Sequence, residues 1–232
     1  MSAVDAVLLD VGGVLILPDA EPLLATLGDA GMTDVTLDDL ARGHYAGIAA
    51  MDRSALAGRP MPDWPAYHAG MTGVLGVEPD RLPGVTEAIG LEFRTLRWTR
   101  PIPGAVDALR RLAATGVAIA IVSNSNGTVE AELLAAGICQ VGPGEGVPVA
   151  AVLDSGAVGI EKPDPRIFLA ALEALGVSAD RAVHVGDTKC ADIAGAERAG
   201  VRPIHLDPHG FCPSPDGHEH VTDLDRVTAL IG

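Results

Sequence analysis

Five short apolar runs, rich in valine and isoleucine, constrain the fold of this chain more than any other feature of its sequence. Each has the length of a buried strand, and they occupy residues 6–10, 118–124, 149–155, 182–187 and 202–207. Continuous apolar runs of this kind are typical of parallel sheets, whose strands are buried on both faces. Several are separated by stretches of helical spacing, such as 103–116 and 163–176, with proline near the start and glycine at the end. The alternation predicts right-handed βαβ crossovers and an α/β fold with a doubly wound parallel sheet.

Residues 16–100 interrupt this alternation. They contain no convincing buried strand, and the pattern of their apolar residues predicts several helices, for example over 20–31, 36–51 and 85–98. Because the segment lies between the first strand and the rest of the sheet, we expect it to be an inserted helical domain. The predicted division is a sheet domain of residues 1–15 and 101–232 and a helical domain of residues 16–100.

Composition excludes several classes of protein. The net charge of −15 argues against non-specific nucleic-acid binding, because an acidic surface repels phosphate backbones. The N-terminal sequence lacks a basic leader, and no run approaches the roughly 20 apolar residues of a membrane helix. The three cysteines are odd in number and far apart, so a disulfide framework is not expected. These features predict a cytoplasmic protein without a membrane partner, and they leave its oligomeric state open.

Polar side chains follow the predicted strands in a regular order. Asp10 ends the first strand, and Ser123 stands at the end of the second. Lys162 lies between the third and fourth strands, and Asp187 and Asp192 follow the fourth. Ligands of doubly wound sheets bind beyond the carboxyl ends of the strands, so we expect these side chains to converge on one site.

The chemistry of this set is coherent. Asp10, Asp187 and Asp192 offer the hard oxygen ligands that suit Mg²⁺. Ser123 and the backbone donors beside it can hold phosphoryl oxygens, while Lys162 can neutralise phosphate and keep Asp10 ionised. A carboxylate nucleophile at Asp10 would form an aspartyl-phosphate and split hydrolysis into two easier steps.

Four motifs carry a resemblance to a known family. The chain contains "LLDVGGVL", "IVSNSNG", "EKPDPRIF" and "HVGDTKCADIAGAERAG", in this order. With these motifs it resembles the haloacid dehalogenase-like hydrolase superfamily, and the last three are close matches to subfamily I phosphatases. The helical insert resembles the C1-type cap of that subfamily by position and helicity. The resemblance implies a Rossmann-like catalytic core and a small phosphorylated substrate.

Carried over position by position, the resemblance implies a set of metal ligands. Asp10 is the nucleophile and a Mg²⁺ ligand, and the backbone carbonyl of Gly12 also coordinates the metal. Asp187 binds Mg²⁺ as well. Asp192 is either a direct ligand or a residue that orients its neighbours.

The resemblance also implies the phosphate contacts. Ser123 and Asn124 bind the phosphoryl group, and Lys162 bridges that group to Asp10. A structural alternative exists for Ser123, because a serine in this position could instead cap a helix.

One position departs from the family pattern. Related phosphatases usually carry a second aspartate two residues after the nucleophile, which protonates the leaving oxygen and activates water, work typically worth about 10²–10⁴-fold. Here that position is Gly12, which retains a carbonyl for the metal but cannot transfer a proton. A substrate with a good leaving group needs little protonation. Otherwise another side chain supplies the proton, and the candidates are Asp19, His44, Tyr45, Tyr67 and His68.

Two other functions stay open at this point. Dehalogenases of the superfamily also lack the second aspartate, but they work without a metal, which would leave Asp187 and Asp192 without a purpose. The chain could also be a catalytically weak protein that binds a phosphorylated ligand or a partner, although Asp10 and Lys162 are both present. Phosphonate-cleaving relatives use a cap lysine, and residues 16–100 contain no lysine.

The C-terminal segment 205–220 is rich in histidine. It contains His205, His209, Cys212, His218 and His220, a set whose chemistry suits zinc or another transition metal. Its three prolines and two glycines predict a surface loop, and it carries no C-x-x-C or H-E-x-x-H pair. Metal binding by this segment is therefore an open hypothesis.

Overall fold

The structure is a computed structural model that describes residues 4–231, and it divides into two compact units. One comprises the chain up to Ile16, Pro101–Pro208 and the chain from Pro215 on, and we call it the sheet unit. The other comprises Leu17–Arg100 and His209–Ser214, and we call it the helical unit. The predicted sheet domain includes residues 1–3 and 232, which lie outside the described residues. In the described part of the chain, no helix has the length and apolar character needed to cross a membrane.

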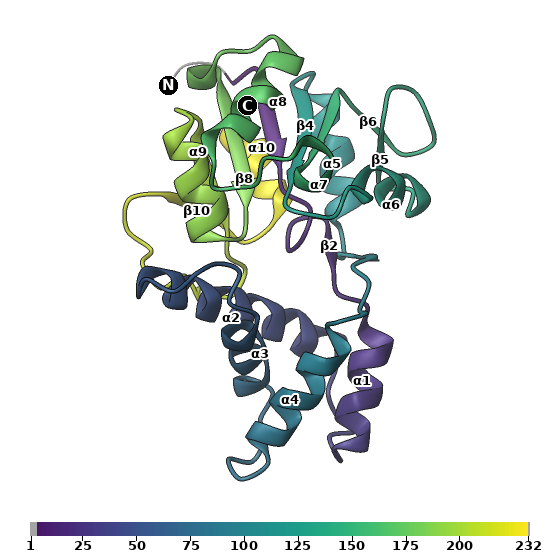
Figure 1. Cartoon of the computed structure of the whole chain (residues 1–232). Helices are drawn as coiled ribbons and strands as arrows, with labels where there is room; N and C mark the ends of the chain where they lie inside the picture. The colour runs from purple at the N-terminus through teal and green to yellow at the C-terminus, as the bar shows by residue number, and fades with distance from the viewer. Residues whose placement is uncertain (1–3, 232) are drawn as a thin grey trace. The chain divides into compact units, whose positions relative to one another are not determined.

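The sheet unit is built on six parallel strands, which confirms the predicted α/β fold with a Rossmann-like, doubly wound sheet. Figure 1 shows β1, in purple, running between β4 and β8. In their order across the sheet the strands are β10 (Glu219–Val221), β9 (Arg202–Leu206), β8 (Ala182–Gly186), β1 (Ala6–Leu9), β4 (Ala118–Ser123) and β7 (Ala151–Asp154).

Helices connect these strands, as the sequence predicts. The elements are α5 (Ala105–Ala114), α6 (Val129–Ala135), α7 (Ser155–Val158), α8 (Pro165–Leu175), the 3₁₀ turn η1 (Ala179–Arg181), the π-helical turn η2 (Lys189–Ile193), α9 (Ala194–Arg198) and α10 (Leu224–Ile231).

Helix α8 shows why the local sequence forms a helix. Asp164 caps its first turn by accepting from the N–H of Arg166, Pro165 opens it, and Gly176 ends it in the left-handed conformation. Its apolar face, which includes Phe168, is buried in the core beneath the sheet.

The central position of β1 places the site. Leu9, its last residue, pairs with Ile121 of β4 on one side and with Val185 of β8 on the other. Because all three strands are parallel, their carboxyl ends meet at the same edge of the sheet. The residue that follows β1 therefore lies between the ends of β4 and β8.

The helical unit contains four helices around its own apolar core. They are α1 (Ala20–Asp29), α2 (Leu37–Leu56), α3 (Trp64–Gly73) and α4 (Leu82–Glu92), and the core gathers residues such as Leu27, Tyr67 and Ile89. Helix α2 begins with a capping box, in which Thr36 and Asp39 each accept a hydrogen bond from the other's backbone N–H. The predicted helices are confirmed, except that α4 ends well before residue 98.

Three short features differ from the sequence prediction. The strand predicted over 149–155 is broken at residue 150, because Val149 belongs to β6 (Val147–Val149), which pairs with β5 (Cys139–Val141) instead of the main sheet. Strands β2 (Ile16–Leu17) and β3 (Arg100–Pro101) form a two-stranded sheet where the chain leaves and re-enters the sheet unit. The end of segment 205–220 is not a loop: it forms the edge strand β10.

Candidate functional site

The polar residues that follow the strands meet at the carboxyl edge of the sheet. Lys162 Nζ lies 2.6 Å from Asp10 Oδ1 and 2.7 Å from Asp192 Oδ1. One carboxylate oxygen each of Asp10, Asp187 and Asp192 lies within 4.8 Å of the others, and all three residues are buried. The structure therefore brings together four of the residues that the sequence singled out.

Lys162 is held in place by three acceptors. Besides the two carboxylates, its Nζ donates to the backbone oxygen of Val122 at 3.0 Å, so all three ammonium protons have a partner. Burial alone disfavours the ammonium, but the carboxylates of Asp10 and Asp192 outweigh burial and raise the pKa of Lys162. Lys162 is therefore a fixed cation at the end of β1.

Asp192 has partners on both carboxylate oxygens. Its Oδ1 accepts from Lys162 and from His184 Nε2 at 2.8 Å, and its Oδ2 accepts from the N–H of Thr188 at 3.1 Å. Burial works to raise the pKa of Asp192, but Lys162 and His184 lower it below the usual value, so this carboxylate stays ionised. The sequence analysis missed His184, whose only signal is a histidine inside the apolar run of β8.

A glycine makes room for Asp192. A Cβ atom on Gly186 would lie 2.2 Å from the carboxyl carbon of Asp192, much closer than any non-bonded contact allows. The glycine before Asp187 is therefore a steric requirement for the Asp192–Lys162 ion pair.

Asp10 and Asp187 differ from Asp192 in their electrostatics. Burial raises the pKa of Asp10 to about 7, with Asp192 and Asp187 adding to the rise and Lys162 opposing it. Burial also raises the pKa of Asp187 to about 7, with a further contribution from Asp192. Two buried carboxyl groups with raised pKa values favour a bound cation, because a cation would stabilise their ionised forms.

The loop after β4 is tied to the rest of the site by side-chain hydrogen bonds. Asn124 Oδ1 accepts from the backbone N–H of Lys162 at 2.7 Å, and its Nδ2 donates to the backbone oxygen of Lys162 at 2.9 Å. The Asn124 amide thus positions the lysine. Asp154, which the sequence analysis did not select, accepts from the N–H groups of Gly127 and Val129 with one carboxylate oxygen. This carboxylate fixes the loop that carries the predicted phosphate contacts.

The turn after β1 is compact and lacks side chains at two positions. The backbone oxygen of Val11 accepts from the N–H groups of Leu15 and Ile16, and Gly13 adopts a left-handed φ of 68°. Gly12 forms an isolated β-bridge with Ile16, which holds its backbone in place. The turn therefore presents backbone groups, and no side-chain acid, beside Asp10.

A family model of haloacid dehalogenase-like hydrolases matches residues 4–200. The chain belongs to this hydrolase family. Its site is accordingly a candidate hydrolase active site, at the sheet edge where the four motif regions of the sequence come together.

Proteins of known activity resemble this hydrolase over part of their length. It is 38% identical over 157 residues to phosphoserine phosphatase from Thermus thermophilus, covering 66% of this chain and 58% of that protein. It is 34% identical over 114 residues to phosphoglycolate phosphatase from Rhodospirillum rubrum, covering 49% of this chain and 44% of that one. The matches span about half of the length of these relatives.

A solved structure supports the fold of the hydrolase along its whole length. The match to the crystal structure of a HAD phosphatase from Thermococcus onnurineus covers 98% of this chain and 98% of that one. Its TM-score is 0.59 and the sequence identity is 21%. At this identity the likeness concerns the fold alone.

Three of the side chains considered as replacements for the missing acid have hydrogen-bond partners inside the helical unit. Asp19 Oδ1 accepts from the N–H and the hydroxyl group of Thr99, at 3.2 and 2.6 Å. His44 Nδ1 lies 2.8 Å from the hydroxyl oxygen of Tyr67, and burial lowers the pKa of His44 to about 3. These hydrogen bonds give Asp19, His44 and Tyr67 structural roles inside the helical unit, whereas His68 Nε2 is buried without a hydrogen-bond partner among the described residues.

Proposed function

We propose that this hydrolase is a Mg²⁺-dependent phosphatase that acts on a small phosphorylated metabolite through an aspartyl-phosphate on Asp10. The observation that carries the proposal is the buried Lys162 ammonium, held between Asp10 and Asp192 beside the carboxyl group of Asp187. Phosphatases among the similar proteins support it. The distinctive feature of the proposed enzyme is Gly12 in place of the second aspartate.

The donor set of the site suits Mg²⁺. Asp10 and Asp187, with the backbone carbonyl of Gly12, would hold the ion, and bound Mg²⁺ would neutralise charge on the phosphoryl oxygens. The raised pKa values of the two carboxyl groups support this assignment, because each gains from a cation. The sequence left two roles open for Asp192. Since both of its oxygens already have partners, we propose that Asp192 positions Lys162 rather than binding the metal.

The residues of the chain supply the two covalent steps. In the first, an oxygen of ionised Asp10 bonds to phosphorus as the bond to the leaving oxygen breaks. Ser123, which ends β4 and therefore does not cap α6, contributes its hydroxyl group to the phosphoryl oxygens together with the backbone N–H of Asn124. Lys162 neutralises phosphoryl charge and favours the ionised form of Asp10. In the second step water attacks phosphorus, Asp10 leaves as a carboxylate, and inorganic phosphate is released.

Proton transfer is the weak point of this mechanism. The leaving oxygen needs a proton unless it is already a stable anion, and Gly12 offers none. We therefore propose a preference for activated substrates such as acyl or aryl phosphates over alkyl phosphates.

We also propose that residues 16–100 act as a C1-type cap on a subfamily I core of residues 1–15 and 101–232. Lids of this kind exclude water and supply substrate contacts. The helical unit has its own core and capped helices, which fits a separately folded insert. We propose a cytoplasmic location, without a nucleic-acid or membrane partner.

The test is hydrolysis of acetyl phosphate, an aryl phosphate and an alkyl phosphate, each with and without Mg²⁺. We expect wild type to cleave the first two only with Mg²⁺. Asp10→Asn should abolish turnover, whereas Asp180→Asn, a matched change at an exposed carboxylate, should not. Gly12→Asp should accelerate the alkyl phosphate by about 10²-fold or more, since it restores the missing acid.

Two results would favour the alternatives. Halide release from a 2-haloacid without Mg²⁺ would support a dehalogenase. Wild-type inactivity toward all three phosphates, together with activity in Gly12→Asp alone, would support a protein that binds phosphorylated ligands without efficient turnover.

A further inference from the structure

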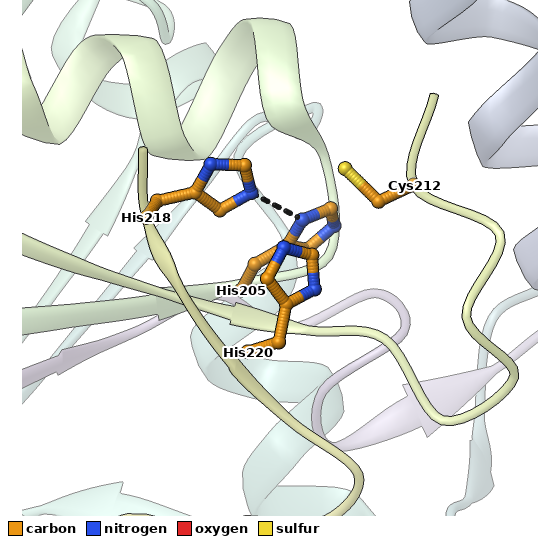
Figure 2. Close-up of side chains that lie close together, drawn as sticks. All are labelled: His205, Cys212, His218 and His220. Carbon is orange, nitrogen blue, oxygen red and sulfur yellow. Dashed lines mark hydrogen bonds between the residues drawn. The ribbon is translucent and has the colours of Figure 1, made fainter. Parts of the chain in front are cut away.

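Three histidines lie close together at the edge of the sheet: His205 is in β9, His220 is in β10, and His218 comes directly before β10. His220 of β10 pairs directly with His205 of β9 in the parallel register. His218 lies two residues before His220, in the bend that leads into β10. Figure 2 shows the three rings facing one another, with centroids 4.5–5.2 Å apart. One ring nitrogen of each histidine lies within 4.8 Å of the others.

The hydrogen bonds of His205 fix its lone pair toward His218. His205 Nε2 donates to the backbone oxygen of Asp187 at 2.8 Å, so its Nδ1 is the nitrogen without a proton in the neutral ring. This Nδ1 lies 3.1 Å from His218 Nε2. Two imidazole nitrogens on one tetrahedral Zn²⁺ lie about 3.3 Å apart, given Zn–N distances of about 2.0–2.1 Å. The pair is therefore already spaced as metal ligands, and a backbone carbonyl orients one ring as in known metal sites.

His220 provides an unsatisfied buried atom. Within the described residues, its Nε2 is shielded from solvent and has no hydrogen-bond partner. A buried polar atom without a partner is destabilising, and a metal bound to this Nε2 would satisfy it. His220 Nδ1 lies 3.7 Å from Asp207 Oδ2, which places a carboxylate beside this ring.

We propose that His205, His218 and His220 form a binding site for Zn²⁺, separate from the acidic cluster around Asp10. An all-nitrogen set is a poor match for Mg²⁺, which prefers oxygen ligands, and a good match for zinc. Cys212 is drawn with the histidines in Figure 2, but it belongs to the segment His209–Ser214, which groups with the helical unit. The proposal therefore rests on the three histidines, and the fourth ligand is a question for experiment.

A metal at this position would have a local consequence. It would link β10 to β9 and so hold together the two ends of the segment that connects them, residues 207–218. Through the His205–Asp187 hydrogen bond it would also restrain the backbone of a residue in the proposed active site.

The experiment uses the full chain, produced without an affinity tag, stripped with a chelator and titrated with Zn²⁺ by calorimetry. We expect one Zn²⁺ per chain, bound more than about tenfold more weakly by His218→Ala and by His220→Ala. His209→Ala is the matched control, because it removes a histidine of the same connection that is not in the cluster. Asp10→Asn should bind Zn²⁺ as wild type does, which separates this site from the proposed phosphatase centre.

Co²⁺ provides a readout on the wild-type protein that does not depend on the folding of any variant. Intense visible d–d absorption indicates a tetrahedral metal ion and supports the site. A sulfur-to-cobalt band that disappears in Cys212→Ser would add Cys212 as the fourth ligand, and its absence would leave that position to water. Failure to bind stoichiometric Zn²⁺, equal weakening in His209→Ala and His218→Ala, or loss of binding in Asp10→Asn would overturn the proposal.

Discussion

Replacing Lys162 by methionine tests the electrostatic basis of the candidate site. The side chain is only 3% exposed, and its Nζ donates to Asp10, Asp192 and the backbone of Val122 at 2.6, 2.7 and 3.0 Å. Methionine has similar length but no charge, so two buried carboxylates lose their cation. Removing one partner of a buried ion pair destabilises proteins by about 3–5 kcal/mol. We expect a loss of this size at about pH 8, a large part of the roughly 5–15 kcal/mol of a typical domain.

The loss should depend on pH in a defined direction. Lys162 opposes the rise of the Asp10 pKa and lowers the Asp192 pKa, so both folded-state values should increase in the variant. When the pKa of a carboxyl group in the folded protein lies above its unfolded value of about 3.9, the free energy of unfolding falls as pH rises between the two values. The fall is at most about 1.4 kcal/mol per pH unit for each such group. The stability of the variant should therefore fall more steeply than that of wild type from about pH 4 upward.

Differential scanning calorimetry without divalent cations, at about pH 5 and pH 8, measures this effect. The matched control is Lys189→Met, the same change at the other lysine of the chain. A Lys162→Met protein that loses less than about 1 kcal/mol at pH 8, or loses equal amounts at both pH values, would refute the reasoning.

Three further predictions concern other parts of the structure. Protons compete with Mg²⁺ for Asp10 and Asp187, because the pKa values of these carboxyl groups are raised to about 7. Mg²⁺ should therefore raise Tm more at about pH 8 than at about pH 5 in thermal scans, and an equal rise in Tm at the two pH values would contradict this. Gly186→Ala forces a Cβ to within 2.2 Å of a buried carboxyl carbon and should destabilise the protein by about 1–3 kcal/mol, whereas Gly84→Ala, with open space around it, should be neutral or stabilising in calorimetry. Thr36→Ala removes the capping box of α2 and should lower the unfolding free energy of the helical unit by about 1 kcal/mol in urea titrations followed by circular dichroism, while Thr36→Ser should retain it.

The sequence predicts the sheet well because its strands are nearly continuous apolar runs. It does not predict β10, since Glu219 and His220 are polar and an edge strand needs little apolar character. It also misplaces the start of β7, because the apolar run 149–155 continues through the residue where the chain leaves one sheet and enters another. Apolar patterns show that a strand is buried, but they do not show which strand it pairs with.

The candidate site is predictable where its residues stand at strand ends or in motifs. Asp10, Lys162 and Asp187 stand at strand ends or in motifs, where sequence position alone suggests chemistry. His184 lies inside an apolar run, and Asp154 ends a strand without a motif, so neither has a sequence signal that separates it from packing. The raised pKa values depend on burial by segments far apart in the chain, which only the folded structure provides.

The central position of β1 also has a consequence for synthesis of the protein. Its first residue, Ala6, pairs with Ala118 and with Ala182. At about 5–20 residues per second, roughly 10–35 s separate translation of β1 from translation of β8. During that interval the helical unit can form its own core, because its helices all lie between residues 17 and 100, while the apolar strand that leads to Asp10 waits for both neighbours. The strand that leads to the proposed nucleophile is thus the first part of the sheet to leave the ribosome, and its second neighbour, β8, follows only after most of the chain has been made.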